Sequence, residues 1–93
     1  MSSDLQPGQL VRSIAGRDKG RWLLIKRGID DKFVEVIDGR MRSFKKPKKK
    51  NRKHLQATQC VDRKINEICM EAKSLKDADV KEAIQRLLEC EEL

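Results

Sequence analysis

The sequence predicts a small β-barrel followed by two amphipathic helices, so the expected fold class is mainly β with a helical end. Short apolar runs alternate with turn residues over the first half of the chain, which is typical of small barrels. The apolar spacing changes to a helical period in the second half. The chain has 93 residues, the size of one domain with a modest core.

Four short strands are expected in the first half of the chain. Three are apolar runs separated by turns, and the fourth is predicted by the pair Asp38-Gly39, a strong hairpin signal. The expected strands cover residues 10–14, 22–25, 33–37 and 41–44. Closing them into a barrel would remove the exposed edges that a lone sheet presents.

Two amphipathic helices are expected after the barrel. The apolar positions of the first are Val61, Ile65, Ile68, Cys69 and Ala72, and those of the second are Val80, Ala83, Ile84, Leu87 and Leu88. Each set forms one apolar stripe, so the helices should pack on the barrel or on each other. Ser74-x-x-Asp77 has the spacing of a capping box at the start of the second helix. The expected organisation is a barrel at 1–57, with a basic loop at 45–54, and a helical extension at 58–93, in one structural domain.

The positive charge of the chain is concentrated in one short stretch. The net charge is +7, yet residues 38–54 carry nine basic groups and one acidic group, while residues 55–93 carry six basic and nine acidic groups. Such asymmetry indicates a polyanionic partner, because each neutralised phosphate releases condensed counterions. Seven of the ten residues in the segment 45–54 are cations, and we expect this loop to follow an RNA backbone. A solvated disordered loop stays open as an alternative.

Several functional classes are not expected. The three cysteines, Cys60, Cys69 and Cys90, are odd in number and show no Cys-x-x-Cys spacing, which favours reduced thiols in a cytoplasmic protein over disulfides or a zinc site. No run of about 18 apolar residues predicts a membrane span. No carboxylate pair, nucleotide-binding signature or triad occurs in a recognisable motif. We therefore expect no enzymatic activity, cofactor, metal, small-molecule substrate or membrane partner.

The loop with two glycines carries the most specific signal. Residues 8–21 read GQLVRSIAGRDKGR. Gly16 and Gly20 can take positive φ and let a partner approach the backbone, and Asp18 is expected to accept hydrogen bonds from the loop's own amides. The three cations of the loop would then stand beside exposed N–H groups, which suits phosphate.

This order of residues resembles the KOW motif, in which a strand leads through a tight glycine loop into a second strand. The resemblance continues through VEVIDGRMR at 34–42 and KPKKKNRKHL at 46–55, which are similar to small KOW proteins of the archaeal and eukaryotic large ribosomal subunit and to short bacterial KOW proteins. It covers roughly residues 5–56. The resemblance implies an SH3-like barrel, ribosomal RNA as the main partner with ribosomal proteins as further contacts, and a cytoplasmic, ribosome-associated location. Trp22 and the three cysteines depart from the family pattern.

The predicted RNA-binding residues combine the glycine loop, its flanks and the basic segment. They are Arg12, Gly16, Arg17, Lys19, Gly20, Arg21, Trp22, Arg40, Arg42, Lys45, Lys46, Lys48, Lys49, Lys50, Asn51, Arg52, Lys53 and His54. Arg40 and Arg42 are expected on one side of the fourth strand, because alternate strand residues share a face.

Two questions stay open at this point. Trp22 could stack on an unpaired base or close one end of the barrel core. The chain could also be a protein-interaction module, since KOW barrels of transcription elongation factors bind polymerase. Replacing Lys48, Lys49 and Lys50 with alanine is expected to weaken RNA binding without unfolding the domain, because exposed substitutions usually have small effects on stability.

Overall fold

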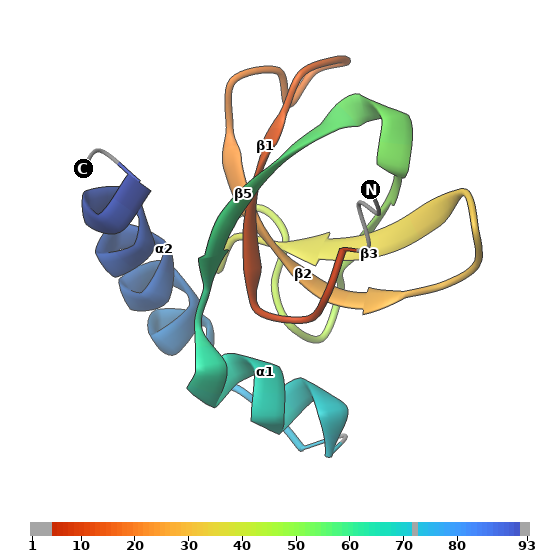
Figure 1. Ribbon diagram of the computed structural model, residues 1–93. Coiled ribbons are helices and arrows are strands. Elements are labelled where there is room, and N and C mark those ends of the chain that lie inside the picture. The colour runs from red at the N-terminus through yellow and green to blue at the C-terminus, as the bar shows by residue number, and fades with distance from the viewer. Residues whose placement is uncertain (1–4, 72, 92–93) are drawn as a thin grey trace.

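The computed structural model describes residues 5–71 and 73–91. It contains a five-stranded antiparallel sheet with two helices to one side of it (Figure 1). The strands are β1 (Gln9–Ser13), β2 (Trp22–Gly28), β3 (Phe33–Ile37), β4 (Lys48–Asn51) and β5 (Leu55–Val61). A 3-10 helix, η1 (Arg52–His54), joins β4 to β5, and the helices are α1 (Arg63–Met70) and α2 (Asp77–Glu91).

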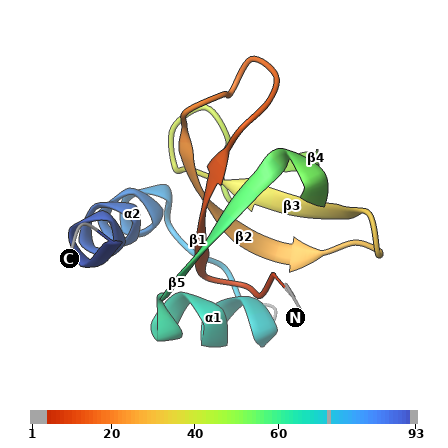
Figure 2. The same ribbon diagram turned by 45° about the horizontal axis from the view of Figure 1, so that its top comes forward.

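The order of the strands forces the sheet to curl. The order is β4-β3-β2-β1-β5, so β4 and β5 form opposite edges although only the three residues of η1 separate them in the chain. Because three residues span only about 10 Å, the two edges must approach each other at η1, and the strands bend accordingly (Figure 2). The backbone of His54 accepts a hydrogen bond from Ile14 N after β1 (2.9 Å), and Arg52 N donates to Lys32 O before β3 (2.8 Å). These bonds hold η1 between the two edges.

Both faces of the sheet are covered by apolar packing. Neighbours along a strand point to opposite faces, and the pairs Leu10↔Leu24 and Val11↔Leu23 are consecutive in the β1–β2 register. Val11 and Leu23 belong to the cluster on the inner face of the curl, with Ile25, Val34, Val36 and Leu55. Leu10 and Leu24 belong to the cluster beneath the helices, with Ile37, Phe44, Ile65, Val80 and Ala83. The helical end therefore completes the packing of the sheet's second face.

The predicted strand at 41–44 is wrong, because Asp38 folds this segment into a loop. Its Oδ1 atom accepts hydrogen bonds from Arg40 N (2.8 Å) and Arg42 N (2.9 Å), and its own amide donates to Arg42 O (2.9 Å). The fourth strand forms later, where Lys48–Asn51 pairs with β3 and places Lys50 opposite Val34. The predicted basic loop at 45–54 is thus wrong over its second part, which is strand and 3-10 helix.

The predicted start of each helix is shifted. Val61 is the last residue of β5, and α1 begins after Asp62, whose side chain accepts a hydrogen bond from Ile65 N (3.0 Å). Ala72, the last position of the predicted first stripe, lies outside the described residues. Neither described helix is long and apolar enough to cross a membrane.

Ser74 does not begin the second helix. α2 starts at Asp77, and the Asp77 carboxylate accepts a hydrogen bond from Phe44 N (2.9 Å). The carboxylate thus anchors the loop after β3 to the helix, and the capping-box interpretation of this spacing is wrong.

Gly39 lies where that loop meets α2, and we predict that Gly39→Ala destabilises the protein. Gly39 has φ = 79°, and an added Cβ would lie 2.5 Å from Asp77 O and 2.9 Å from Lys81 Cγ. A positive φ costs a non-glycine residue on the order of 1–3 kcal/mol, and the overlap with α2 adds to this cost. Urea unfolding measures the free-energy change.

Gly20→Ala is the matched control. Gly20 also has positive φ, 90°, but an added Cβ would meet nothing within 4 Å. Gly20→Ala should therefore lose only the part of the unfolding free energy that comes from placing a non-glycine residue at positive φ. Equal losses of unfolding free energy in the two variants would contradict the close packing of Gly39 against α2.

Candidate nucleic-acid interface

The glycine loop between β1 and β2 projects from one end of the sheet (Figure 2). Gly16 has φ = 78° and Gly20 has φ = 90°, as only glycine adopts readily. Gly20 N donates to Ser13 O (2.8 Å), and Lys19 N donates to Gly16 O (3.2 Å). This turn exposes the side chains of Arg17, Lys19 and Arg21, so the structure presents all three predicted cations of the loop to solvent.

Asp18, at the centre of this loop, connects it to β4. Its Oδ2 atom lies 2.8 Å from Lys48 Nζ and 3.7 Å from Lys50 Nζ, while Lys50 Nζ also donates to Ala15 O (3.1 Å). We expected the Asp18 side chain to accept hydrogen bonds from amides of its own loop, but it contacts the lysines of β4 instead. The hydrogen bond from Lys48 and the charges of Lys48, Lys50 and Arg42 lower the pKa of Asp18 against the opposing effect of burial. The carboxylate is ionised at neutral pH.

The lysines of β4 divide between its two sides. Lys48 and Lys50 turn toward Asp18, whereas the exposed Lys49 places its Nζ 4.4 Å from the centre of the Phe33 ring. Lys50 is only 6% exposed. The expectation that Lys48, Lys49 and Lys50 are all exposed is therefore wrong. Replacing all three with alanine would remove the ion pairs with Asp18 as well as the exposed charge of Lys49.

The cations of the loop after β3 lie on no strand. Arg40, Lys45 and Lys46 are exposed, and Arg42 is half-buried. The expected shared strand face of Arg40 and Arg42 is wrong, because the hydrogen bonds of Asp38 curl this segment. Arg42 lies close enough to Asp18 for its charge to lower the pKa of that carboxyl.

The last predicted residues form η1 and its cap. The Asn51 side chain accepts a hydrogen bond from Lys53 N (2.8 Å), and the Arg52 guanidinium donates twice to Asp30 O (3.1 and 2.8 Å). Asn51 and Arg52 thus hold the turn between β4 and β5. Lys53 and His54 are exposed and remain accessible to a partner.

Trp22, at the start of β2, is half-buried and packs against the cluster beneath the helices. Trp22 therefore packs, but on the sheet face beneath the helices and not at an end of the core inside the curl. On β1, the opposite residue in register is Arg12, an exposed side chain whose guanidinium carbon lies 5.6 Å from the indole centre. This distance is within the range of a cation–π contact.

One cation of this surface was missed by the sequence analysis. Lys81 of α2 lines the same groove as Arg21 and Arg40. Its position on a predicted helix in the acidic half of the chain gave no signal that it would stand beside the glycine loop. Only the packing of α2 on the sheet brings it there.

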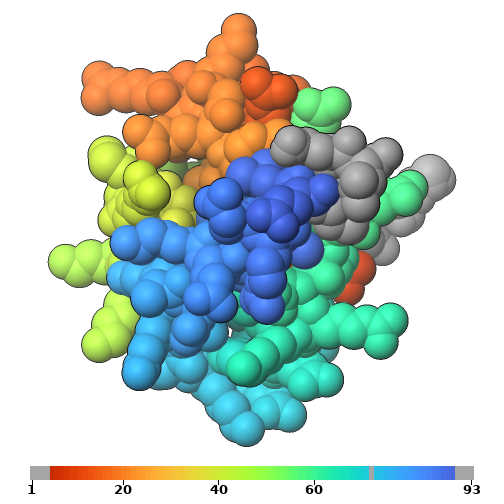
Figure 3. Space-filling model, turned by 90° about the vertical axis from the view of Figure 1, so that its left-hand side faces the viewer, coloured from red at the N-terminus to blue at the C-terminus, as the bar shows by residue number. Residues whose placement is uncertain are grey.

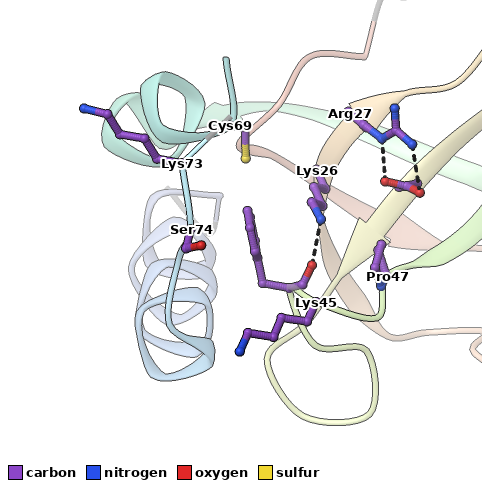
Figure 4. A pocket seen from close by; sticks show the side chains of 9 residues that line it. Lys26, Arg27, Lys45, Pro47, Cys69, Lys73 and Ser74 are labelled. Atoms are coloured by element: carbon purple, nitrogen blue, oxygen red, sulfur yellow. Dashed lines mark hydrogen bonds and ion pairs between the residues drawn. The ribbon is translucent and has the colours of Figure 1, made fainter. Parts of the chain in front are cut away.

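A second hollow, of about 440 Å³, lies between the sheet and the segment after α1 (Figure 4). Three of its cations are engaged: Lys26 Nζ donates to Phe44 O (2.7 Å), Arg27 pairs with Glu35 (2.7 Å) and Lys73 pairs with Glu71 (2.9 Å). Burial raises the pKa of the Cys69 thiol at its wall, opposed by the charge of Lys26. Because the thiolate is the reactive form of cysteine, this thiol is a poor nucleophile at neutral pH.

We predict that Asp18→Asn lowers the unfolding free energy at neutral pH by roughly 1–3 kcal/mol, since Lys50 then keeps a buried charge without its carboxylate. The folded protein lowers the pKa of Asp18, so this stabilisation is present above the unfolded value of about 3.9. It is lost as the pH falls through the lower folded value. Unfolding by urea from pH 7 to pH 2.5 should show the two proteins converging below about pH 4. A gap that persists unchanged at the lowest pH would contradict the ion pair.

Neither the models of known protein families nor the curated proteins include a match to this chain. The resemblance to KOW proteins therefore rests on the residues quoted from the sequence and stays a prediction. The chemistry of the exposed surface is an independent basis for a functional proposal.

Proposed function

We propose that this protein binds RNA through phosphate contacts made by the glycine loop and the basic surface beside it. The observation that carries the proposal is the bridge from Asp18 to Lys48 and Lys50. This bridge fixes a loop with three exposed cations against the most basic segment of the chain. Two cationic segments that are some thirty residues apart in sequence (Asp18 to Lys48) thereby become one surface.

The surface keeps an excess of positive charge after its internal pairing. Asp18 is one carboxylate among Lys48, Lys50 and Arg42, so its ion pairs neutralise only part of the local charge. The exposed cations Arg17, Lys19, Lys46 and Lys53 add to the excess. Holding like charges together in a fixed loop is costly unless a polyanion is bound, and phosphate groups supply the compensating charge.

The backbone of the loop favours close contact with phosphate. An added Cβ at Gly20 would meet nothing within 4 Å, so a ligand can approach the chain there. Contacts of this kind position a protein on folded RNA by phosphates and shape more than by base edges. We therefore assign binding, and not catalysis, to this surface.

The proposal extends to the fold family and the partner. The curled sheet, whose edges approach each other at η1, supports the proposal of an SH3-like barrel of the KOW type. The resemblance of residues 5–56 to small KOW proteins favours ribosomal RNA, with ribosomal proteins nearby, in the cytoplasm.

The variant R17A/K19A tests the phosphate contacts. Both side chains are exposed, so we expect weaker binding of a structured ribosomal RNA fragment without loss of thermal stability. Two lost phosphate contacts should reduce the log–log salt slope by about 1.4–1.8. Fluorescence anisotropy at several salt concentrations measures both quantities.

The matched control is R63A/K64A, which removes two exposed cations from the first turn of α1. It has the same net charge as the test variant but leaves the loop intact, and should bind nearly as well as the unmodified protein. Equal losses in both variants would mean that only the total charge matters. Binding of a protein instead of RNA, the alternative function, would show little response to salt.

Sedimentation of a cell extract in a sucrose gradient tests the ribosomal partner. We expect the protein to migrate with large subunits in low salt, because its contacts are with phosphate. Retention in high salt would indicate an integral component, and release would indicate a peripheral factor. Migration only at the top of the gradient in both salts would overturn the ribosomal assignment. RNA binding itself would then be decided by the anisotropy titration of the ribosomal RNA fragment.

A further inference from the structure

A groove of about 240 Å³ lies where the glycine loop, the loop after β3 and α2 meet. Figure 3 shows this face: residues near 20 in orange, residues near 40 in yellow-green and α2 in blue border a hollow. Its lining includes Arg21, Trp22, Arg40, Lys81, Ile84 and Leu88. The lining combines one aromatic ring and two aliphatic side chains with three cations.

The apolar part of the groove comes from two elements. Trp22 of β2 and Ile84 and Leu88 of α2 are partly buried side chains that pack against the cluster beneath the helices. Each therefore has a supported position and some surface left over. A flat ligand that enters the groove contacts the Trp22 indole, which the fold holds in place and which the Arg12 guanidinium approaches to 5.6 Å.

The polar part of the groove attracts anions. Arg21, Arg40 and Lys81 are exposed. Asp38 is the one carboxylate of the lining, and it is engaged by two backbone amides of the loop and by Arg21, whose Nη1 lies 3.9 Å from Oδ2. The groove therefore keeps an excess of positive charge around its apolar side chains.

We propose that this groove receives one unpaired nucleobase of the bound RNA, while Arg21, Arg40 and Lys81 contact the phosphates on either side of it. The inference rests on the proposed RNA-binding function. An aromatic ring beside cations is the combination that binds single-stranded nucleic acid. The volume is below the range of about 300–1,000 Å³ typical of pockets for whole small molecules, which favours a single ring system.

Continuity with the glycine loop identifies RNA as the occupant. Arg21 closes that loop, since its amide donates to Asp18 O (2.8 Å), and its side chain also lines the groove. A strand whose phosphates lie on Arg17 and Lys19 therefore reaches the groove with its next nucleotides. Bases inside a duplex are stacked on both faces, so only a loop, bulge or single strand can supply one.

The fluorescence of Trp22 tests this inference directly, because the chain has one tryptophan and no tyrosine. A mixed-sequence 12-nucleotide RNA carrying a fluorescein label is titrated into the full chain, alone or annealed to its complement. Anisotropy reports binding, and tryptophan emission reports the groove. We expect the single strand to quench Trp22 emission as it binds, and the duplex to bind without this quenching.

Two substitutions of Trp22 separate stacking from packing. Trp22→Leu keeps apolar bulk against α2 but removes the aromatic face, and should lower single-strand affinity by roughly 5- to 150-fold. Trp22→Phe keeps an aromatic face and should retain most of the affinity. Circular dichroism melting verifies that both variants fold.

Lys81→Glu and Lys64→Glu test the cationic side of the groove with equal charge changes on two exposed helix positions. Lys81 lines this groove, whereas Lys64 lines a different hollow between the helices. We expect Lys81→Glu to weaken single-strand binding several-fold and to reduce the quenching. Lys64→Glu should leave both nearly unchanged.

The outcomes distinguish this inference from the function on which it rests. Binding of the single strand with unchanged Trp22 emission, or equal quenching by the duplex, overturns the nucleobase site and leaves phosphate binding intact. Equal affinities of the Leu and Phe variants also overturn it. Absence of binding by anisotropy for both RNAs overturns the proposed function and the groove together.

Discussion

The rest of the structure depends on the carboxylate of Asp18. It places a negative charge where Lys48 and Lys50 converge, and this charge offsets the repulsion between these two lysines of β4, the edge strand beside β3. Lys50 is nearly buried, and a buried ammonium needs a partner to offset its lost hydration. Because β4 leads through η1 into β5, the same ion pairs help to set the curl of the whole sheet.

The acidic half of the chain has a related structural role. Asp62 caps α1 and pairs with Arg86 of α2 (2.9 Å), while Asp77 at the start of α2 holds Phe44 N (2.9 Å). These carboxylates join the helices to each other and to the loop after β3. Part of the negative charge of residues 55–93 therefore stabilises the packing of the helical end. The cationic surface lies elsewhere, on the glycine loop and β4.

Charge counting overstates the surface that a nucleic acid can contact. Lys50 and Arg52 belong to the basic segment, yet the first is buried against Ala15 O and the second is bound to Asp30 O. Lys81, which the count assigned to the acidic half, stands at the groove with Arg21 and Arg40. The candidate interface thus leaves out some residues of the basic run. It adds a residue of α2 that is distant in sequence.

The sequence by itself determined the local features of this protein. Alternating apolar runs place β1, β2 and β3, helical spacing places most of α1 and α2, and the glycines at 16 and 20 set the turn between β1 and β2, because each depends on neighbours in the chain. Tertiary structure decided the rest. Asp38 could begin a hairpin or curl a loop, and the loop that forms is tied to α2 by the contact of Phe44 N with Asp77. The lysine run could be mobile or form β4, and it forms β4 by contact with Asp18 and by pairing with β3. Long-range ion pairs and packing against α2 stabilise the loop after β3 and strand β4 over their alternatives. The same packing against α2 forms the groove at Trp22.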